Sequence, residues 1–303
     1  MRYLIVGAGG TGGSIAGYLH AAGQSVTLLD QGQHLTAIQQ QGLTIHRLSG
    51  GQLVLADIEA KSSVEYQEQA DVIFVCVKSY SIQDILPLLA RAAHRDTVII
   101  PILNIYGTGA KLAQHLPNLT ICDGCIYIAA EISAPGEILH RGEIFRVIFG
   151  SRDPAQRLAI FDEIAADLQA SGIDGRVADD ILSAALHKYA LISGMAAVGA
   201  LLDVEAGAFQ QADSEARLLF ITLLEEMQLL ARAMGVWLRE DLVAETLAMV
   251  DALGPTMTTS AQKDLKKGGP SELDGLVFEV VRMAEHWGVE LPQYERVSRR
   301  LGF

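Results

Sequence analysis

The sequence has few cysteines and a shortage of positive charge. Three cysteines among 303 residues cannot build a disulfide framework, so a packed core must hold the chain together. Only 23 lysines and arginines stand against 36 aspartates and glutamates, and the formal net charge of -13 would repel a nucleic-acid backbone and an anionic membrane surface alike. We therefore expect no nucleic acid and no membrane among the partners.

Long hydrophobic runs are also missing. The longest, residues 190–202, is shorter than the roughly 20 residues that a membrane-spanning helix needs, and Ser193 and Gly194 interrupt it. It is expected to be a buried core helix. The chain begins directly with an apolar strand, which leaves no room for a signal peptide and predicts a cytoplasmic protein. The histidines show no spacing typical of metal ligands, so no metal site is expected.

Two kinds of hydrophobic pattern divide the chain. Short apolar runs alternate with helical stretches at first, as is typical of a parallel sheet flanked by helices. These runs are residues 3–6, 25–29, 72–77, 98–102, 119–128 and 138–149. From residue 179 onward the apolar residues recur at helical spacing. The sequence therefore predicts an α/β, doubly wound dinucleotide-binding domain over residues 1–178 and an all-helical domain over residues 179–303.

Two apolar helices are expected in the second domain, at residues 218–233 and 276–284. Their apolar faces could bury against a partner chain, in a homodimer, or against each other. Gly235 and Gly288 are placed to end two helices, and Trp237 and Trp287 are expected in the core or at a domain face.

A glycine-rich segment is the strongest motif. It follows the first strand, opens a helix, and consists of Gly7, Ala8, Gly9, Gly10, Thr11 and Gly12. Gly7 permits a tight turn, Gly9 lets the backbone approach a pyrophosphate, and Gly12 lets helix and strand pack closely. Asp30 closes the second strand, where its carboxylate would bind an adenosine ribose. Since a carboxylate repels a 2′-phosphate, Asp30 favours NAD over NADP.

With these features the chain resembles the ketopantoate reductase (2-dehydropantoate 2-reductase) family. The other matching features are Val77-Lys78 after a strand, Asn104 with Gly107, Lys188, the segment 135–140 and the segment 271–274. The resemblance implies a Rossmann domain joined to a helical domain similar to that of 6-phosphogluconate dehydrogenase. It also implies hydride transfer from NAD(P)H, usually NADPH, to a small 2-oxo acid, as 2-dehydropantoate is reduced to pantoate in pantothenate biosynthesis.

The resemblance assigns roles to five residues. Lys188 matches the catalytic lysine that protonates the forming alkoxide, and Glu272 matches the glutamate that supports it. Lys78 and Asn104 match residues beside the nicotinamide, Asn104 also facing the reacting carbonyl, and Ser260 matches a serine that contacts the substrate carboxylate. Without the resemblance, Lys188 reads as a solvated helix boundary, Glu272 as a helix-start residue and Asn104 as a turn residue.

Four positions that depart from the family pattern affect the substrate and the cofactor. Ile192 and Ala196 stand where the family usually carries asparagines, and Ile105 replaces a glycine after Asn104. A paralogue that acts on a more apolar 2-oxo or 2-hydroxy acid, or a regulatory protein that binds nucleotide without turnover, therefore stays open. Asp30 conflicts with NADPH, although Gln31 or His34 could still meet a phosphate.

Overall fold

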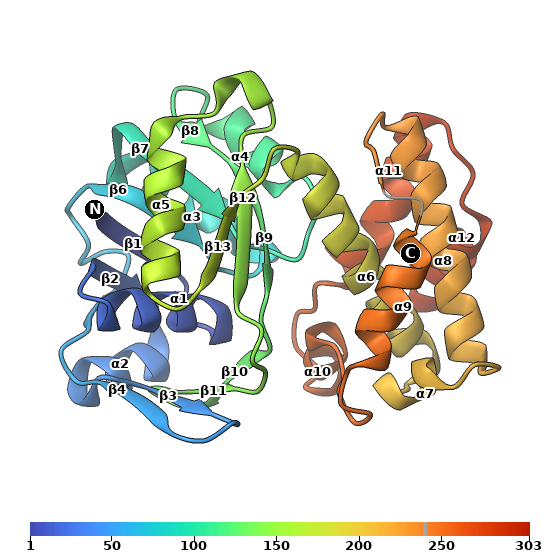
Figure 1. The fold of residues 1–303 in the computed structure, drawn as a ribbon, viewed down its shortest axis with the longest axis horizontal. Helices are drawn as coiled ribbons and strands as arrows, with labels where there is room; N and C mark the ends of the chain where they lie inside the picture. The colour runs from blue at the N-terminus through green and yellow to red at the C-terminus, as the bar shows by residue number, and fades with distance from the viewer. Residues whose placement is uncertain (239–240) are drawn as a thin grey trace. The chain divides into compact units, whose positions relative to one another are not determined.

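The computed structural model describes residues 1–238 and 241–303, which form two compact units (Figure 1). The first unit comprises Met1–Leu103 and Gly107–Ile181, and the second comprises Asn104–Tyr106 and Leu182–Phe303. The short segment Asn104–Tyr106 therefore belongs with the helical part of the chain, although it follows a strand of the first unit.

A six-stranded parallel sheet forms the centre of the first unit. Its strand order is β5-β2-β1-β6-β7-β8, and every neighbouring pair is parallel. The strands are β1 (Arg2–Val6), β2 (Ser25–Leu29), β5 (Glu59–Lys61), β6 (Ala70–Val75), β7 (Ala93–Pro101) and β8 (Thr120–Ile121). This order confirms the predicted doubly wound sheet of the Rossmann type, whose order reverses between β1 and β6.

Alternate residues of the central strands face two different cores. In β1, Tyr3 and Ile5 belong to the core under α1 (Gly10–Ala21) and α5 (Ala159–Ala170). Leu4 and Val6 belong to the core under α3 (Ile82–Ala92) and α4 (Thr108–His115). Because both faces of the sheet are buried, β1 is apolar at four successive positions, from Tyr3 to Val6.

Two smaller sheets complete the first unit. One has the order β10-β11-β3-β4 and the other β13-β12-β9. Their strands, with the helix α2, are β3 (Leu43–Arg47), β4 (Gln52–Leu55), β9 (Asp123–Tyr127), β10 (Ala130–Ala134), β11 (Glu137–His140), β12 (Arg146–Gly150), β13 (Asp174–Val177) and α2 (Gly32–Gln41). The expected single run at residues 138–149 is thus two strands of different sheets, because exposed residues 141–143 interrupt it.

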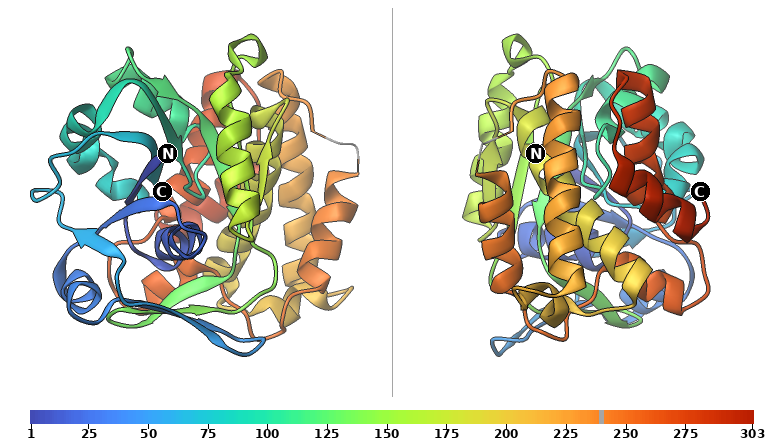
Figure 2. Two further views of the ribbon diagram at one scale, coloured as in Figure 1. Left: turned by 60° about the vertical axis from the view of Figure 1, so that its left-hand side comes forward. Right: turned by 90° about the vertical axis from the view of Figure 1, so that its right-hand side faces the viewer.

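The second unit is built from helices, and its described residues contain no strand (Figure 2). The helices are α6 (Ile181–Leu202), α7 (Ala206–Gln210), α8 (Glu215–Ala233), α9 (Leu242–Asp251), α10 (Ser260–Lys266), the π-helical turn η3 (Asp274–Phe278), α11 (Glu279–Trp287) and α12 (Pro292–Leu301). By length and composition alone α6 could cross a membrane, but most of it is buried in the core of this unit.

The two predicted apolar helices lie in α8 and around η3 and α11, and α8 packs against α11 within the chain. Gly235 follows α8 and Gly288 caps α11, both with positive φ, as predicted. Trp237 is 65% exposed and Trp287 is nearly half exposed, so neither has the core position that was one of the two expected. An indole can lie on the surface because its apolar body tolerates partial hydration.

Candidate active site

The turn between β1 and α1 is shaped by two glycines. Gly7 has a φ of +103°, and its N–H donates to the carbonyl of Leu29 at 2.9 Å. A Cβ on Gly7 would lie 3.1 Å from the backbone of Cys76 and Val77, and a Cβ on Gly12 would overlap the carbonyl oxygen of Gly7. The backbone of the turn therefore lies directly against α1 and against the end of β6.

Gly9 differs from its neighbours, because its Cβ direction points into open space. No atom of the described residues lies within 4 Å of a Cβ built there, whereas a Cβ on Gly10 would overlap the backbone of Ala130. Among the described residues no side chain caps the first turn of α1, and that turn contains no acidic residue. Backbone N–H groups and open space at a helix N-terminus fit a pyrophosphate.

Asp30 follows β2 at the same edge of the sheet and is half-buried. Its Oδ1 accepts a hydrogen bond from the N–H of Gln31 at 2.8 Å. Burial raises the pKa of Asp30, and the backbone N–H groups of Gln31 and Ala8 partly offset that effect. Neither ring nitrogen of His34 is left to meet a cofactor phosphate, because both are hydrogen-bonded within the protein, to Ala8 and Gly136.

Lys78 lies just beyond β6, at the strand-order reversal. It is half-buried, and its carbonyl accepts from the N–H of Ser81 at the short helical turn η1 (Ser79–Ser81). The N–H of Cys76 donates to Val6, so this segment runs beside the glycine turn. Gly7 to Gly12, Asp30 and Lys78 thus all come from the carboxyl ends of three adjacent strands, β1, β2 and β6.

Lys188 and Glu272 are both almost fully buried in the second unit, with 9% and 5% of their surface exposed. Lys188 lies in the second turn of α6, and Glu272 lies two residues before η3. The hydroxyl of Tyr189 donates to the carbonyl of Gly275 at 2.7 Å, which ties the Lys188 turn to the Glu272 segment. The N–H of Leu276 donates to the carbonyl of Glu272 at 2.9 Å.

The two residues that follow Asn104 pack against the segments that carry Lys188 and Glu272. Ile105 is buried in the helical core, and a Cβ on Gly275 would overlap its side chain. The ring of Tyr106 lies 6.1 Å from the ring of Tyr189, between centroids. Contacts among these segments therefore bring Asn104, Lys188 and Glu272 into one region of the second unit. Half-buried Asn104 is placed there by packing rather than by its strand.

Ser260 lies outside these segments, in α10. It is the exposed first residue of α10, and Thr259 caps that helix. The amide of Gln262 donates to the carbonyls of Gly199 and Val204 at 3.0 and 2.8 Å. Gly199 comes 11 residues after Lys188, about 16 Å along an ideal helix. No described contact links Ser260 to the Lys188 region.

The face of α6 that follows Lys188 is apolar. Ile192 packs partly buried against the core and Ala196 is fully buried. Ser193 gives no polar substitute, because its hydroxyl is buried and hydrogen-bonded to the Tyr294 hydroxyl at 2.9 Å.

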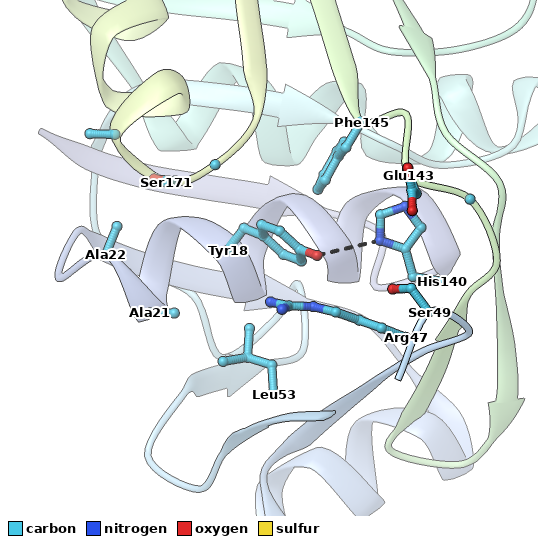
Figure 3. Close-up of a pocket in the computed structure, with 13 residues that line it drawn as sticks. Tyr18, Ala21, Ala22, Arg47, Ser49, Leu53, His140, Glu143, Phe145 and Ser171 are labelled. Carbon is cyan, nitrogen blue, oxygen red and sulfur yellow. Dashed lines mark hydrogen bonds between the residues drawn. The ribbon is translucent and has the colours of Figure 1, made fainter. Parts of the chain in front are cut away.

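A separate pocket of about 500 Å³ lies at the C-terminal end of α1 in the first unit (Figure 3). The guanidinium carbon of Arg47 lies 5.2 Å from the centroid of the Tyr18 ring. The Tyr18 hydroxyl lies 3.5 Å from Nδ1 of buried His140. Burial lowers the pKa of His140. The described lining includes none of the catalytic, substrate-binding or cofactor-binding residues predicted from the sequence, although His140 ends the segment 135–140 that resembles the family.

The chain is similar to known proteins over nearly its whole length. The family model described as "Ketopantoate reductase PanE/ApbA" matches residues 3–154, and "Ketopantoate reductase PanE/ApbA C terminal" matches residues 180–302. A 2-dehydropantoate 2-reductase of Halobacterium salinarum is 28% identical over 293 residues, which cover 96% of this chain and 95% of the relative. An uncharacterized oxidoreductase of Bacillus subtilis, YkpB, is 27% identical and covers 99% and 98%.

Solved structures share the fold over the full length. 2-Dehydropantoate 2-reductase from Geobacter metallireducens has a TM-score of 0.91 at 24% identity, covering 99% of both chains. D-mandelate dehydrogenase, solved with NADH and anilino(oxo)acetate, has a TM-score of 0.88 at 22% identity, covering 99% of this chain and 97% of the other.

Proposed function

The chain belongs to the ketopantoate reductase family of oxidoreductases, and on that premise we propose that it is an NADH-dependent reductase of a 2-oxo acid. The main support is the packing of the segments that carry Asn104, Lys188 and Glu272. Each segment carries a group suited to a carbonyl or its proton, and residues beside these groups are in contact, although 84 residues separate Asn104 from Lys188 and 84 more separate Lys188 from Glu272. As the family suggests, 2-dehydropantoate is the first substrate to test.

In this proposal the backbone from Gly7 to Gly12 binds the pyrophosphate of the cofactor, and Asp30 binds its adenosine ribose. The preference for NADH is supported by an absence of nearby cations, because the sequence has no lysine or arginine from residue 3 to residue 46. The neighbouring strand β5 does carry Lys61, beside Leu29, but Glu59 and Glu68 hold its ammonium at 2.9 and 2.7 Å. A 2′-phosphate would meet a carboxylate without a matching cation.

The chemistry follows from the residue types. The nicotinamide supplies a hydride to the carbonyl carbon when the cofactor is bound. Lys188 gives a proton from its ammonium to the carbonyl oxygen as negative charge develops there, and solvent reprotonates the amine. The amide of Asn104 donates a hydrogen bond to the same oxygen, and Glu272 orients the ammonium. Ser260 rests on the resemblance alone.

A second candidate, reduction of a more apolar 2-oxo acid or oxidation of the matching 2-hydroxy acid, is favoured by Ile192 and Ala196. Neither side chain can hydrogen-bond a substrate hydroxyl, and losing such a bond in a buried site costs about 1 to 3 kcal/mol. D-mandelate dehydrogenase shares the fold and acts, by its name, on an aromatic 2-hydroxy acid.

The test is oxidation of NADH and of NADPH with 2-dehydropantoate and a series of branched and aromatic 2-oxo acids. Asp30→Ala should weaken NADH binding much more than NADPH binding, and the isosteric Asp30→Asn should do so less, since it can still accept a hydrogen bond. Equal effects on both dinucleotides would remove Asp30 from the ribose site. Tight cofactor binding with no turnover of any acid would favour a regulatory protein.

A further inference from the structure

His34 joins the glycine turn to a hairpin of the neighbouring sheet. Its Nε2 lies 3.0 Å from the carbonyl oxygen of Ala8, in the glycine turn. Its Nδ1 lies 3.0 Å from the backbone nitrogen of Gly136, in the turn between β10 and β11. His34 itself is in the first turn of α2 and is half-buried. One side chain therefore bridges two backbone segments that are 128 residues apart.

The two partners fix the protonation of the ring. The Gly136 N–H can only donate, so Nδ1 must accept and carries no hydrogen. The Ala8 carbonyl can only accept, so Nε2 must donate and carries the hydrogen. The imidazole is therefore neutral in this arrangement, and both of its hydrogen-bonding positions are used.

The hairpin also touches the glycine turn at a second point. Gly10, the first residue of α1, lies directly against the backbone of Ala130 in β10, with no room for a Cβ. Gly136 has a φ of +79°, and its carbonyl accepts from the N–H of Thr44 in β3 at 2.9 Å. The hairpin is thus anchored to its own sheet, and through His34 and Gly10 it contacts both ends of the loop around Gly9.

We propose that His34 is a positioning residue for the dinucleotide. By holding the carbonyl of Ala8, it keeps the open side of Gly9 and the N–H groups at the start of α1 directed at the pyrophosphate. The inference deepens the proposed function, because it names a residue that acts on cofactor binding through the loop and does not touch the cofactor itself. It accounts for a histidine that the glycine motif does not predict.

The experiment compares three variants by titrating the fluorescence of NADH, without any 2-oxo acid. His34→Leu removes both hydrogen bonds and should raise the Kd for NADH about tenfold. His34→Gln should restore Kd to within about twofold of the unaltered protein, because its amide carries an acceptor and a donor on one carbon, as the imidazole does on Cε1. His46→Leu is the control, since His46 pairs with Glu137 of the same hairpin and has no described bond to the glycine turn.

Melting temperatures separate positioning from folding. If His34→Leu melts too early to titrate, His34→Asn replaces it, because its shorter amide cannot span both partners. Unchanged Kd in the folded Leu or Asn variant, or a Gln variant as weak as the Leu variant, would overturn the inference. If the unaltered protein binds neither NADH nor NADPH, the proposed function fails instead, and exchange of the Gly136 amide hydrogen, expected to speed up in His34→Leu, then tests the bridge in the protein alone.

Discussion

The two units carry their candidate site residues in different ways. In the first, one continuous turn at Gly7 to Gly12 contributes most of the site, and its shape follows from backbone conformation and the absence of side chains. In the second, Asn104, Lys188 and Glu272 come from three distant segments that Ile105, Tyr189 and Gly275 hold together. Local sequence determines the first site, whereas the second site forms only when the helices pack together.

Two matched glycine variants test the glycine turn of the first unit, and they should have the largest effects. Gly12→Ala places a methyl group on the carbonyl of Gly7, which cannot move away, so unfolding free energy should fall by at least about 3 kcal/mol. Gly9→Ala should leave the melting temperature nearly unchanged, because φ is -59° and the methyl meets open space, yet it should weaken NADH binding strongly. Calorimetry and NADH titration measure the two effects.

The contrast between these variants is the informative result. If Gly9→Ala bound NADH normally, the open side of Gly9 would not be where the pyrophosphate lies. A destabilised Gly9→Ala protein would mean that the turn has no free space there.

A packing change beside Glu272 should disrupt the candidate site of the second unit. Gly275→Ala forces a methyl group onto the end of the Ile105 side chain, so kcat should fall several-fold while the Kd for NADH stays the same. Because that end is flexible, the cost should be only about 1 to 3 kcal/mol. Ile105→Ala combined with Gly275→Ala should recover part of the loss, and a strictly additive double variant would show that the two residues do not couple.

The smallest predicted effect is a difference in pH dependence between the units. Asp71 in the first unit has its pKa lowered to about 2 because hydrogen bonds from Arg2 and His94 outweigh the effect of burial. Its stabilisation is present above its ordinary pKa of 3.8 and is lost as pH falls from about 4 to 2. The Arg2 side chain is 56% exposed and that of Asp71 is 28% exposed, so solvent screens their interaction and the change should stay below about 1 kcal/mol.

Glu226 in the second unit should act in the opposite sense. Burial raises its pKa, although the N–H groups of Gln293 and Tyr294 donate to its carboxylate at 2.7 and 2.9 Å. The folded state then holds the proton more tightly than the unfolded state, so stability falls as pH rises above the ordinary pKa of 4.5. Chemical denaturation of Asp71→Asn and Glu226→Gln across pH 2 to 7 should remove one slope each, and unchanged slopes would contradict the two assignments.

The sequence predicted the elements that are long or strongly apolar. The strands at residues 3–6 and 25–29, the helix beginning at Gly10 and the helical second domain are all present. It missed β4 and β5, because they are strands of only four and three residues that depend on a neighbour for pairing. The expected single strand at residues 119–128 likewise divides into β8 and β9 of different sheets.

The candidate site divides in the same way. Asp30 and Lys78 fall at strand ends that the apolar pattern locates, so their place at the sheet edge could be predicted. The membership of Asn104 in the helical unit could not, since it depends on where Ile105 and Tyr106 pack. No local sequence signal indicated that Gln262 holds α10 against α6 by donating to the carbonyl of Gly199.

The central claim is that Lys188 supplies the proton and the glycine turn binds the cofactor, as two separable functions. It is tested most directly by the turnover of Lys188→Ala at saturating NADH, on whichever 2-oxo acid the unaltered protein reduces, with exposed Lys267→Ala as the control. We predict a fall in kcat of about a hundred- to ten-thousand-fold with an unchanged Kd for NADH. Turnover equal to that of the control would contradict the account.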